Sequence, residues 1–102
     1  MNHIREPQDC STMAEVRAGV DDTDRKIIAL LTRRFGYMDA AARIKPDRAI
    51  VRDEARKAQV LDNIRVEASK HGLDSELLAH LYDQLIEACI AYEFEEFDRL
   101  RA

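Results

Sequence analysis

The stretch that decides the fold is residues 13–45, MAEVRAGVDDTDRKIIALLTRRFGYMDAAARIK, in which no proline occurs. Its apolar residues recur at spacings of three and four, which predicts one long amphipathic helix. Thr12 and Glu15 stand three residues apart and fit a capping box at the start of this helix. Pro46 should end the helix, because proline lacks a backbone N–H and disfavours helical geometry in the residue before it.

Two further helices are expected downstream. The first begins near residues 51–53 and ends at His71 and Gly72, since glycine is the usual residue just after a helix. The second is capped by Asp74 or Ser75 and runs to the C-terminus. The sequence therefore predicts an all-α fold with three helices per chain, one long, one medium and one long.

Composition agrees with this fold and argues against several classes of function. The chain has 102 residues with only 3 Gly and 2 Pro, so we expect one helical domain over residues 1–102, in which residues 1–11 are a loosely ordered lead-in. The net charge of −4 argues against a nucleic-acid partner. No apolar run is long enough to cross a membrane. Two cysteines far apart in the sequence predict reduced thiols and a cytoplasmic protein.

The long helix carries more apolar surface than one chain of this size can cover. At about 1.5 Å per residue it extends about 50 Å, whereas a compact chain of this length has a radius of gyration of about 13 Å. Besides its first apolar face the helix has a second one, formed by Met13, Val20, Ile28, Leu31 and Phe35. We infer that a second copy covers the remainder, in an intertwined homodimer.

Three charged residues stand on faces that should be buried. Arg34 lies within the first apolar face of the long helix, Lys45 continues that face, and Glu93 lies within the apolar face of the last helix. The apolar residues of these faces are Ile27, Leu30, Met38 and Ala41, and Tyr82, Ile86, Cys89, Phe97 and Leu100. Because an unpaired buried charge is costly, the pattern predicts an internal ion-pair network or a pocket for a charged ligand.

Cations outnumber acids on these faces. Arg17 lies on the second apolar face, about 100° from Arg34 around the helix, so a site that used both would borrow Arg17 from the neighbouring chain. Arg56 is a further candidate cation. Guanidinium groups bind carboxylates through two parallel hydrogen bonds and stay charged when buried. The excess of cations therefore favours a small dicarboxylate ligand.

The sequence contains no motif that indicates covalent catalysis or a metal site. His3 lies in the lead-in, His71 at a helix end and His80 on a helix flank, so no histidine assembles with Ser or Cys into a nucleophile–base pair. No HExxH motif, Gly-rich phosphate loop or Cys/His cluster occurs. We therefore expect neither a metal nor a nucleotide cofactor.

Four motifs resemble those of a known family in their order and spacing. They are Val16-Arg17 with Asp21 and Asp24, Leu30-Leu31-Thr32-Arg33-Arg34, Ala41-Ala42-Arg43-Ile44-Lys45, and Val51-Arg52-Asp53-Glu54-Ala55-Arg56. Over roughly residues 8–98 the chain resembles the all-helical class of chorismate mutases and their relatives, the isochorismate-pyruvate lyases. The resemblance implies an interlaced three-helix dimer with two equivalent sites, which agrees with the argument from helix length.

The resemblance also implies roles for six residues. Arg34, together with Arg17 from the partner subunit, would grip the two substrate carboxylates. Lys45 would donate to the ether oxygen and to a carboxylate, and Glu93 would face the same ether oxygen. Two more residues would line the pocket, one near the ring hydroxyl and one as further positive charge: Asp53 and Arg56.

The implied reaction is the Claisen rearrangement of chorismate to prephenate, a step of aromatic amino acid biosynthesis. It is intramolecular, so a site can act by holding a reactive conformer and by placing donors at the oxygen that gains negative charge. The alternative is cleavage of isochorismate to salicylate and pyruvate. Val51-Arg52-Asp53 is typical of the mutase, whereas the segment Pro7-Gln8-Asp9-Cys10 looks lyase-like.

A hypothesis from another class is a non-catalytic helical dimer whose inward charges only set the pairing register. It predicts ion pairs of Glu93 with Arg34 or Lys45, and no cavity of ligand size. The enzyme hypothesis predicts a cavity lined by Arg34, Lys45, Arg56 and Arg17 of the partner subunit. Taken singly, Lys45 also fits a cation at a helix C-terminus.

Overall fold

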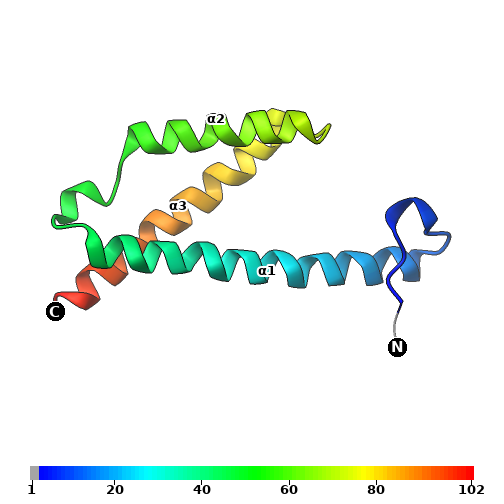
Figure 1. Cartoon of the computed structure of the whole chain (residues 1–102), viewed down its shortest axis with the longest axis horizontal. Helices are drawn as coiled ribbons and strands as arrows, with labels where there is room; N and C mark the ends of the chain where they lie inside the picture. Colours follow the sequence, from blue (N-terminus) through cyan, green and yellow to red (C-terminus); the bar gives the residue numbers. More distant parts are fainter. Residues whose placement is uncertain (1–2) are drawn as a thin grey trace. The chain divides into compact units, whose positions relative to one another are not determined.

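The computed structural model describes residues 3–102 and is helical throughout its regular elements. Three α-helices and two short 3₁₀ helices follow one another along this part of the chain, without a strand (Figure 1). In chain order they are η1 (Pro7–Asp9), α1 (Met13–Ile44), η2 (Arg48–Ile50), α2 (Glu54–Lys70) and α3 (Ser75–Leu100). The prediction of an all-α chain with one long, one medium and one long helix is confirmed, and the homodimer stays a prediction.

The start of α1 is fixed by the capping box expected there. Thr12 Oγ1 accepts a hydrogen bond of 3.2 Å from the Glu15 backbone N–H, and Glu15 Oε1 accepts one of 3.1 Å from the Thr12 N–H. The Ser11 backbone N–H donates to the same carboxylate and lowers the pKa of Glu15 to about 2, with further hydrogen bonds from the side chains of Ser11 and Thr12. Arg5 forms an ion pair with this carboxylate as well. The Glu15 carboxylate at the start of α1 therefore also holds the N-terminal segment in place, through Arg5.

The ends of α2 and the start of α3 follow the same local rules. Asp53 caps α2 by accepting a hydrogen bond of 3.0 Å from the Arg56 N–H. After His71 the chain turns at Gly72, whose φ of 72° lies in the left-handed region that glycine adopts without strain. Of the two predicted caps for α3, Asp74 is the one that accepts the first backbone N–H groups.

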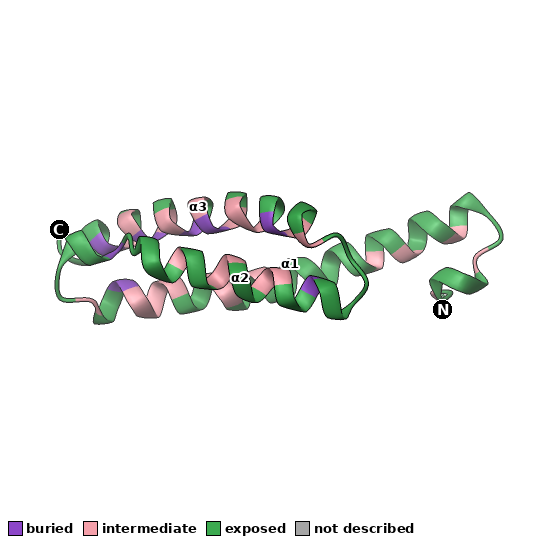
Figure 2. Ribbon diagram, turned by 90° about the horizontal axis from the view of Figure 1, so that it is seen from above, coloured by how far each residue is buried: buried purple, intermediate pink, exposed green. Residues whose placement is uncertain are grey.

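The chain divides into two compact units, Met1–Gly36 and Tyr37–Ala102. In the second unit α2 packs against α3, and α3 carries most of the buried residues of the chain (Figure 2). Ala42, Val51 and Phe97 form a buried cluster, against which Phe94 packs. This cluster holds the end of α1 and the loop after it to the last turns of α3, and so it supports Lys45 and Glu93.

The first unit has no buried residue between positions 3 and 36. Several of its large apolar side chains are exposed, and the most exposed are Leu30 at 67% and Ile28 at 61%. Its N-terminal segment, predicted to be loosely ordered, contains the short helix η1, while residues 1 and 2 of the predicted lead-in lie outside the described residues. No helix in residues 3–102 is both long and apolar enough to span a membrane.

Candidate active site

Lys45 lies at the first position after α1, where Pro46 stops the helix. Its backbone N–H still donates to the Ala41 carbonyl at 2.9 Å, so the residue keeps the direction of the helix. Its ammonium lies 2.7 Å from Glu93 Oε2 and donates a hydrogen bond of 3.2 Å to the Val51 carbonyl. The side chain is 26% exposed, so the chain does not enclose it fully.

Glu93 is a buried carboxylate on the apolar face of α3. Its side chain is 5% exposed, and its neighbours on that face, Ile86, Cys89 and Phe97, are buried too. The Lys45 ammonium is close enough for an ion pair, yet its direction does not satisfy hydrogen-bond geometry at Oε2, which has no hydrogen-bond partner among the described residues. Since a buried polar atom without such a partner is uncommon, Glu93 keeps a position at which a further donor could bind.

Asp53 and Arg56 lie at the start of α2, and both are exposed. Asp53 serves as the helix cap, while the Arg56 guanidinium donates to Gln59 Oε1 at 2.7 Å. In the contacts described for the chain, neither residue joins Lys45 and Glu93. The structure therefore assigns Asp53 a helix-capping role, and the pocket role implied for both residues stays a prediction.

Arg17 and Arg34 belong to α1 within the first unit. Arg17 is exposed, and Arg34 is partly buried. The structure brings Lys45 and Glu93 together from different elements. The contribution of Arg17 across subunits stays a prediction.

A charged cluster that the sequence analysis did not identify links the start of α2 to α3. The Arg52 guanidinium donates to Glu87 at 2.8 Å and to Glu54 at 2.8 Å, and the Lys57 ammonium lies 2.9 Å from Asp83 and 2.8 Å from Glu87. The hydrogen bonds from Arg52 and then Lys57 lower the pKa of Glu87 to about 2. The signal that could have found this cluster is the four-residue spacing of two acids on α3.

A second missed contact joins α1 and α3 beside Glu93. The Tyr92 hydroxyl donates to Asp39 Oδ1 at 2.5 Å. Loss of the tyrosine proton would place two negative charges together, so this hydrogen bond raises the pKa of Tyr92 to about 12. Tyr92 is therefore a neutral donor near neutral pH, and its hydrogen bond ties α3 to α1 next to Glu93.

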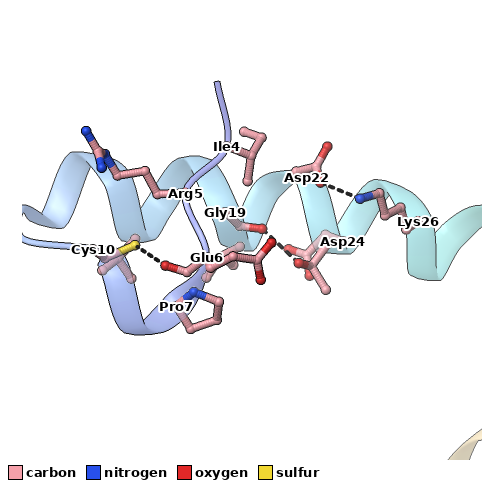
Figure 3. A pocket seen from close by; sticks show the side chains of 12 residues that line it. Ile4, Arg5, Glu6, Pro7, Cys10, Gly19, Asp22, Asp24 and Lys26 are labelled. Atoms are coloured by element: carbon pink, nitrogen blue, oxygen red, sulfur yellow. Dashed lines mark hydrogen bonds and ion pairs between the residues drawn. The ribbon is translucent and has the colours of Figure 1, made fainter. Parts of the chain in front are cut away.

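A cavity of about 420 Å³ lies in the first unit, between the N-terminal segment and the first half of α1 (Figure 3). Its lining mixes apolar residues such as Ile4, Pro7 and Val20 with charged ones such as Asp22 and Lys26. None of the six predicted site residues lines it. Among residues 3–102, no group of three or more His, Cys, Asp or Glu side chains is placed to hold a metal ion.

Two features of the geometry bear on the kind of protein. A long helix ends next to a cation that meets a buried carboxylate of the last helix, and residues 3–36 include no buried residue. A model of the chorismate mutase type II family matches residues 16–94. The chain belongs to this family.

Two curated relatives carry different activities in their names. An isochorismate pyruvate lyase of Pseudomonas aeruginosa is 31% identical over 98 residues, which cover 96% of this chain and 97% of the relative. A chorismate mutase of Methanocaldococcus jannaschii is 30% identical over 76 residues, which cover 74% of this chain and 77% of the relative. The family and the names of both relatives support an enzymatic function, but they do not distinguish between the two reactions.

Proposed function

We propose that this chain is a chorismate mutase, which converts chorismate to prephenate in the cytoplasm. The observation that carries the proposal is the contact between Lys45 and Glu93, two residues that the family resemblance assigns to the ether oxygen of the substrate. They come from different helices and meet in a buried setting of the kind that such a reaction needs.

The chemistry asks for charge stabilisation rather than for a reactive group. In the rearrangement the ether C–O bond breaks while a C–C bond forms within the same molecule, and negative charge grows on the oxygen. An acceleration of about a millionfold requires about 8 kcal/mol, whereas a surface ion pair supplies about 0–1 kcal/mol. Lys45 must therefore act with the arginines in a site from which water is excluded.

Under this proposal the carboxylates of the substrate are bound by Arg34 and by Arg17 of the partner subunit. The Lys45 ammonium donates to the ether oxygen. Glu93 lies at the same oxygen and can help only as a protonated donor, because an ionised carboxylate would repel the charge that develops there. Asp53 and Arg56 complete the pocket when a ligand is bound.

A second reaction, the cleavage of isochorismate to salicylate and pyruvate, is favoured by one specific observation. The match to the lyase relative extends over 96% of the chain, beyond residues 16–94 where the family model matches. The added part includes the segment with Pro7 and Cys10, which folds into η1 and the turn after it. We keep this reaction as the alternative activity of the same site.

The deciding experiment is incubation of the purified protein with chorismate and, separately, with isochorismate, followed by identification of the products. Prephenate from the first supports the proposal, and salicylate with pyruvate from the second supports the alternative. Lys45→Ala should lower kcat about 100- to 1,000-fold, to a residual rate that is still measurable, whereas Lys70→Ala, at an exposed lysine of α2 with only a 3.4 Å contact to Glu67, should leave the activity unchanged. If neither compound is converted, the non-catalytic helical dimer, which also predicts the Lys45–Glu93 ion pair, becomes the better account.

A further inference from the structure

The last turn of α1 is held by a residue from the far end of the chain. Carbonyl groups at a helix C-terminus have no partner within the helix. Arg101 donates from Nη1 to the Ala42 carbonyl at 2.9 Å and from Nη2 to the Lys45 carbonyl at 2.8 Å. One guanidinium thus closes the helix end from outside, and one of the two carbonyls it binds belongs to Lys45 itself.

The guanidinium of Arg101 is fixed from its own side as well. Its Cζ atom lies 3.6 Å from the centre of the Phe97 ring, and Nη1 also donates to the Phe97 carbonyl at 3.2 Å. Phe97 is 6% exposed and belongs to the buried cluster with Ala42 and Val51. Only a planar fork with several donors can stack on a ring and bind two carbonyls at once, so a lysine at this position could not replace the arginine fully.

Lys45 is therefore held at both ends. Arg101 binds its backbone carbonyl, while Glu93 and the Val51 carbonyl hold its ammonium. Val51 belongs to the same buried cluster as Phe97, on which Arg101 stacks. The contacts that hold the backbone and the ammonium of Lys45 therefore both involve this cluster.

We propose that Arg101 is a positioning residue that sets the place of the Lys45 ammonium in the active site. The proposal rests on the proposed function, since it takes Lys45 as the donor to the substrate. Arg101 itself touches no substrate. A donor displaced by about 1 Å can cost about a hundredfold in rate, and the loss appears in kcat because the donor acts on charge that exists only in the transition state.

The first test compares Arg101→Ala with Arg99→Ala. Arg99 lies two residues before Arg101, in the last turn of α3, but its exposed side chain pairs with Glu96 and makes no hydrogen bond to a carbonyl of α1 among the described residues. We expect Arg101→Ala to lower kcat about 10- to 100-fold with a smaller change in KM, and added guanidinium ion to restore part of the loss. Arg99→Ala should behave as the unchanged protein. An unchanged kcat in Arg101→Ala overturns the proposal.

A second measurement separates positioning from loss of folding. In a Lys45→Ala background, Arg101→Ala should cause no further loss of kcat, because the group that it positions is gone. If the two losses multiply, Arg101 acts elsewhere and the proposal is wrong. Arg101→Lys keeps the charge and should fold normally, and we expect its kcat to lie between those of Arg101→Ala and the unchanged protein.

The NMR signal of the Lys45 side-chain Cε reports position without any turnover. We expect it to shift in Arg101→Ala and to stay unchanged in Arg99→Ala, with the signal assigned by its absence in Lys45→Arg. A signal that does not move in Arg101→Ala overturns the positioning role. If the signal moves but neither chorismate nor isochorismate is converted by the unchanged protein, the proposed function fails while the positioning of Lys45 by Arg101 stands.

Discussion

At the scale of single residues, the contact between Lys45 and Glu93 carries both the enzyme hypothesis and its non-catalytic rival. In the free chain the ammonium lies near the buried carboxylate, so neither charge is isolated. A bound dianionic substrate would compete with Glu93 for the Lys45 ammonium and would add negative charge beside Glu93. The enzyme hypothesis therefore makes a prediction about Glu93 that the non-catalytic hypothesis does not make.

We expect Glu93→Gln to keep or raise kcat, because Glu93 can help only as a hydrogen-bond donor to the ether oxygen and the glutamine amide is a permanent donor of similar size. The measurement is kcat and kcat/KM for Glu93→Gln and for the unchanged protein. A lower kcat in Glu93→Gln would contradict a donor role at this position.

At the scale of helices, local rules predicted the ends of the elements well. The Thr12–Glu15 capping box, the stop at Pro46 and the turn at Gly72 all occur where the sequence placed them. Such features depend on neighbours in sequence, and their physical causes are short-ranged. The burial of Glu93 was predictable too, because helical periodicity fixes the face on which a residue lies.

Contacts between helices were predicted less well. The family resemblance implied a place for Asp53 near the substrate, and that role stays a prediction. In the structure its carboxylate caps α2, a contact that local sequence rules do predict. Arg101 binds carbonyls at the end of α1 from 59 and 56 positions further along the chain, and no local pattern marks such a contact. Which donor meets which acceptor across helices depends on side-chain rotamers and on the crossing of the helices, which periodicity does not specify.

The cluster between α2 and α3 should make the fold sensitive to acid. Arg52 and Lys57 lower the pKa of Glu87 from 4.5 to about 2. A carboxylate whose pKa is lower in the folded chain contributes stability above its unfolded pKa, and this contribution is lost as the proton binds. We therefore expect the free energy of unfolding to decrease as the pH is lowered from 4.5 to about 2. Urea unfolding at several pH values provides the measurement.

The matched control for this prediction is a glutamate outside the cluster. Glu87→Gln should remove part of the acid dependence, whereas Glu67→Gln, at an exposed residue paired with Lys70 at 3.4 Å, should leave it unchanged. Equal slopes against pH for Glu87→Gln and the unchanged protein would mean that the cluster does not stabilise the fold.

Gly36 lies inside α1, which is continuous from Met13 to Ile44. Glycine inside a helix costs about 0.5–1 kcal/mol relative to alanine, and apart from the adjacent residues and backbone of the helix itself, no described atom lies within 4 Å of a Cβ placed at this position. We expect Gly36→Ala to raise the free energy of unfolding by about 0.5–1 kcal/mol. Urea unfolding provides the measurement, and a destabilised variant would show that another chain approaches the helix closely at this point.

At the scale of the whole molecule, the first unit gives the strongest reason to expect a second copy. Between residues 3 and 36 nothing is buried, although Ile28 and Leu30 are large and apolar. Burying such surface supplies the main driving force for association. A homodimer would cover it, and under the proposed function the same association would bring Arg17 of one subunit to the Lys45 site of the other.

This crossed arrangement has a quantitative consequence for mixed dimers. Arg17→Ala and Lys45→Ala should each retain only a small residual activity as homodimers. When equal amounts are unfolded and refolded together, half of the dimers contain one chain of each kind, and one of their two sites combines an intact Arg17 with an intact Lys45. We therefore expect activity to return to about a quarter of that of the unchanged protein, as measured by product formation after refolding. If Arg17 served the site of its own chain, every site in the mixed dimer would lack one of the two residues, and refolding together would restore nothing.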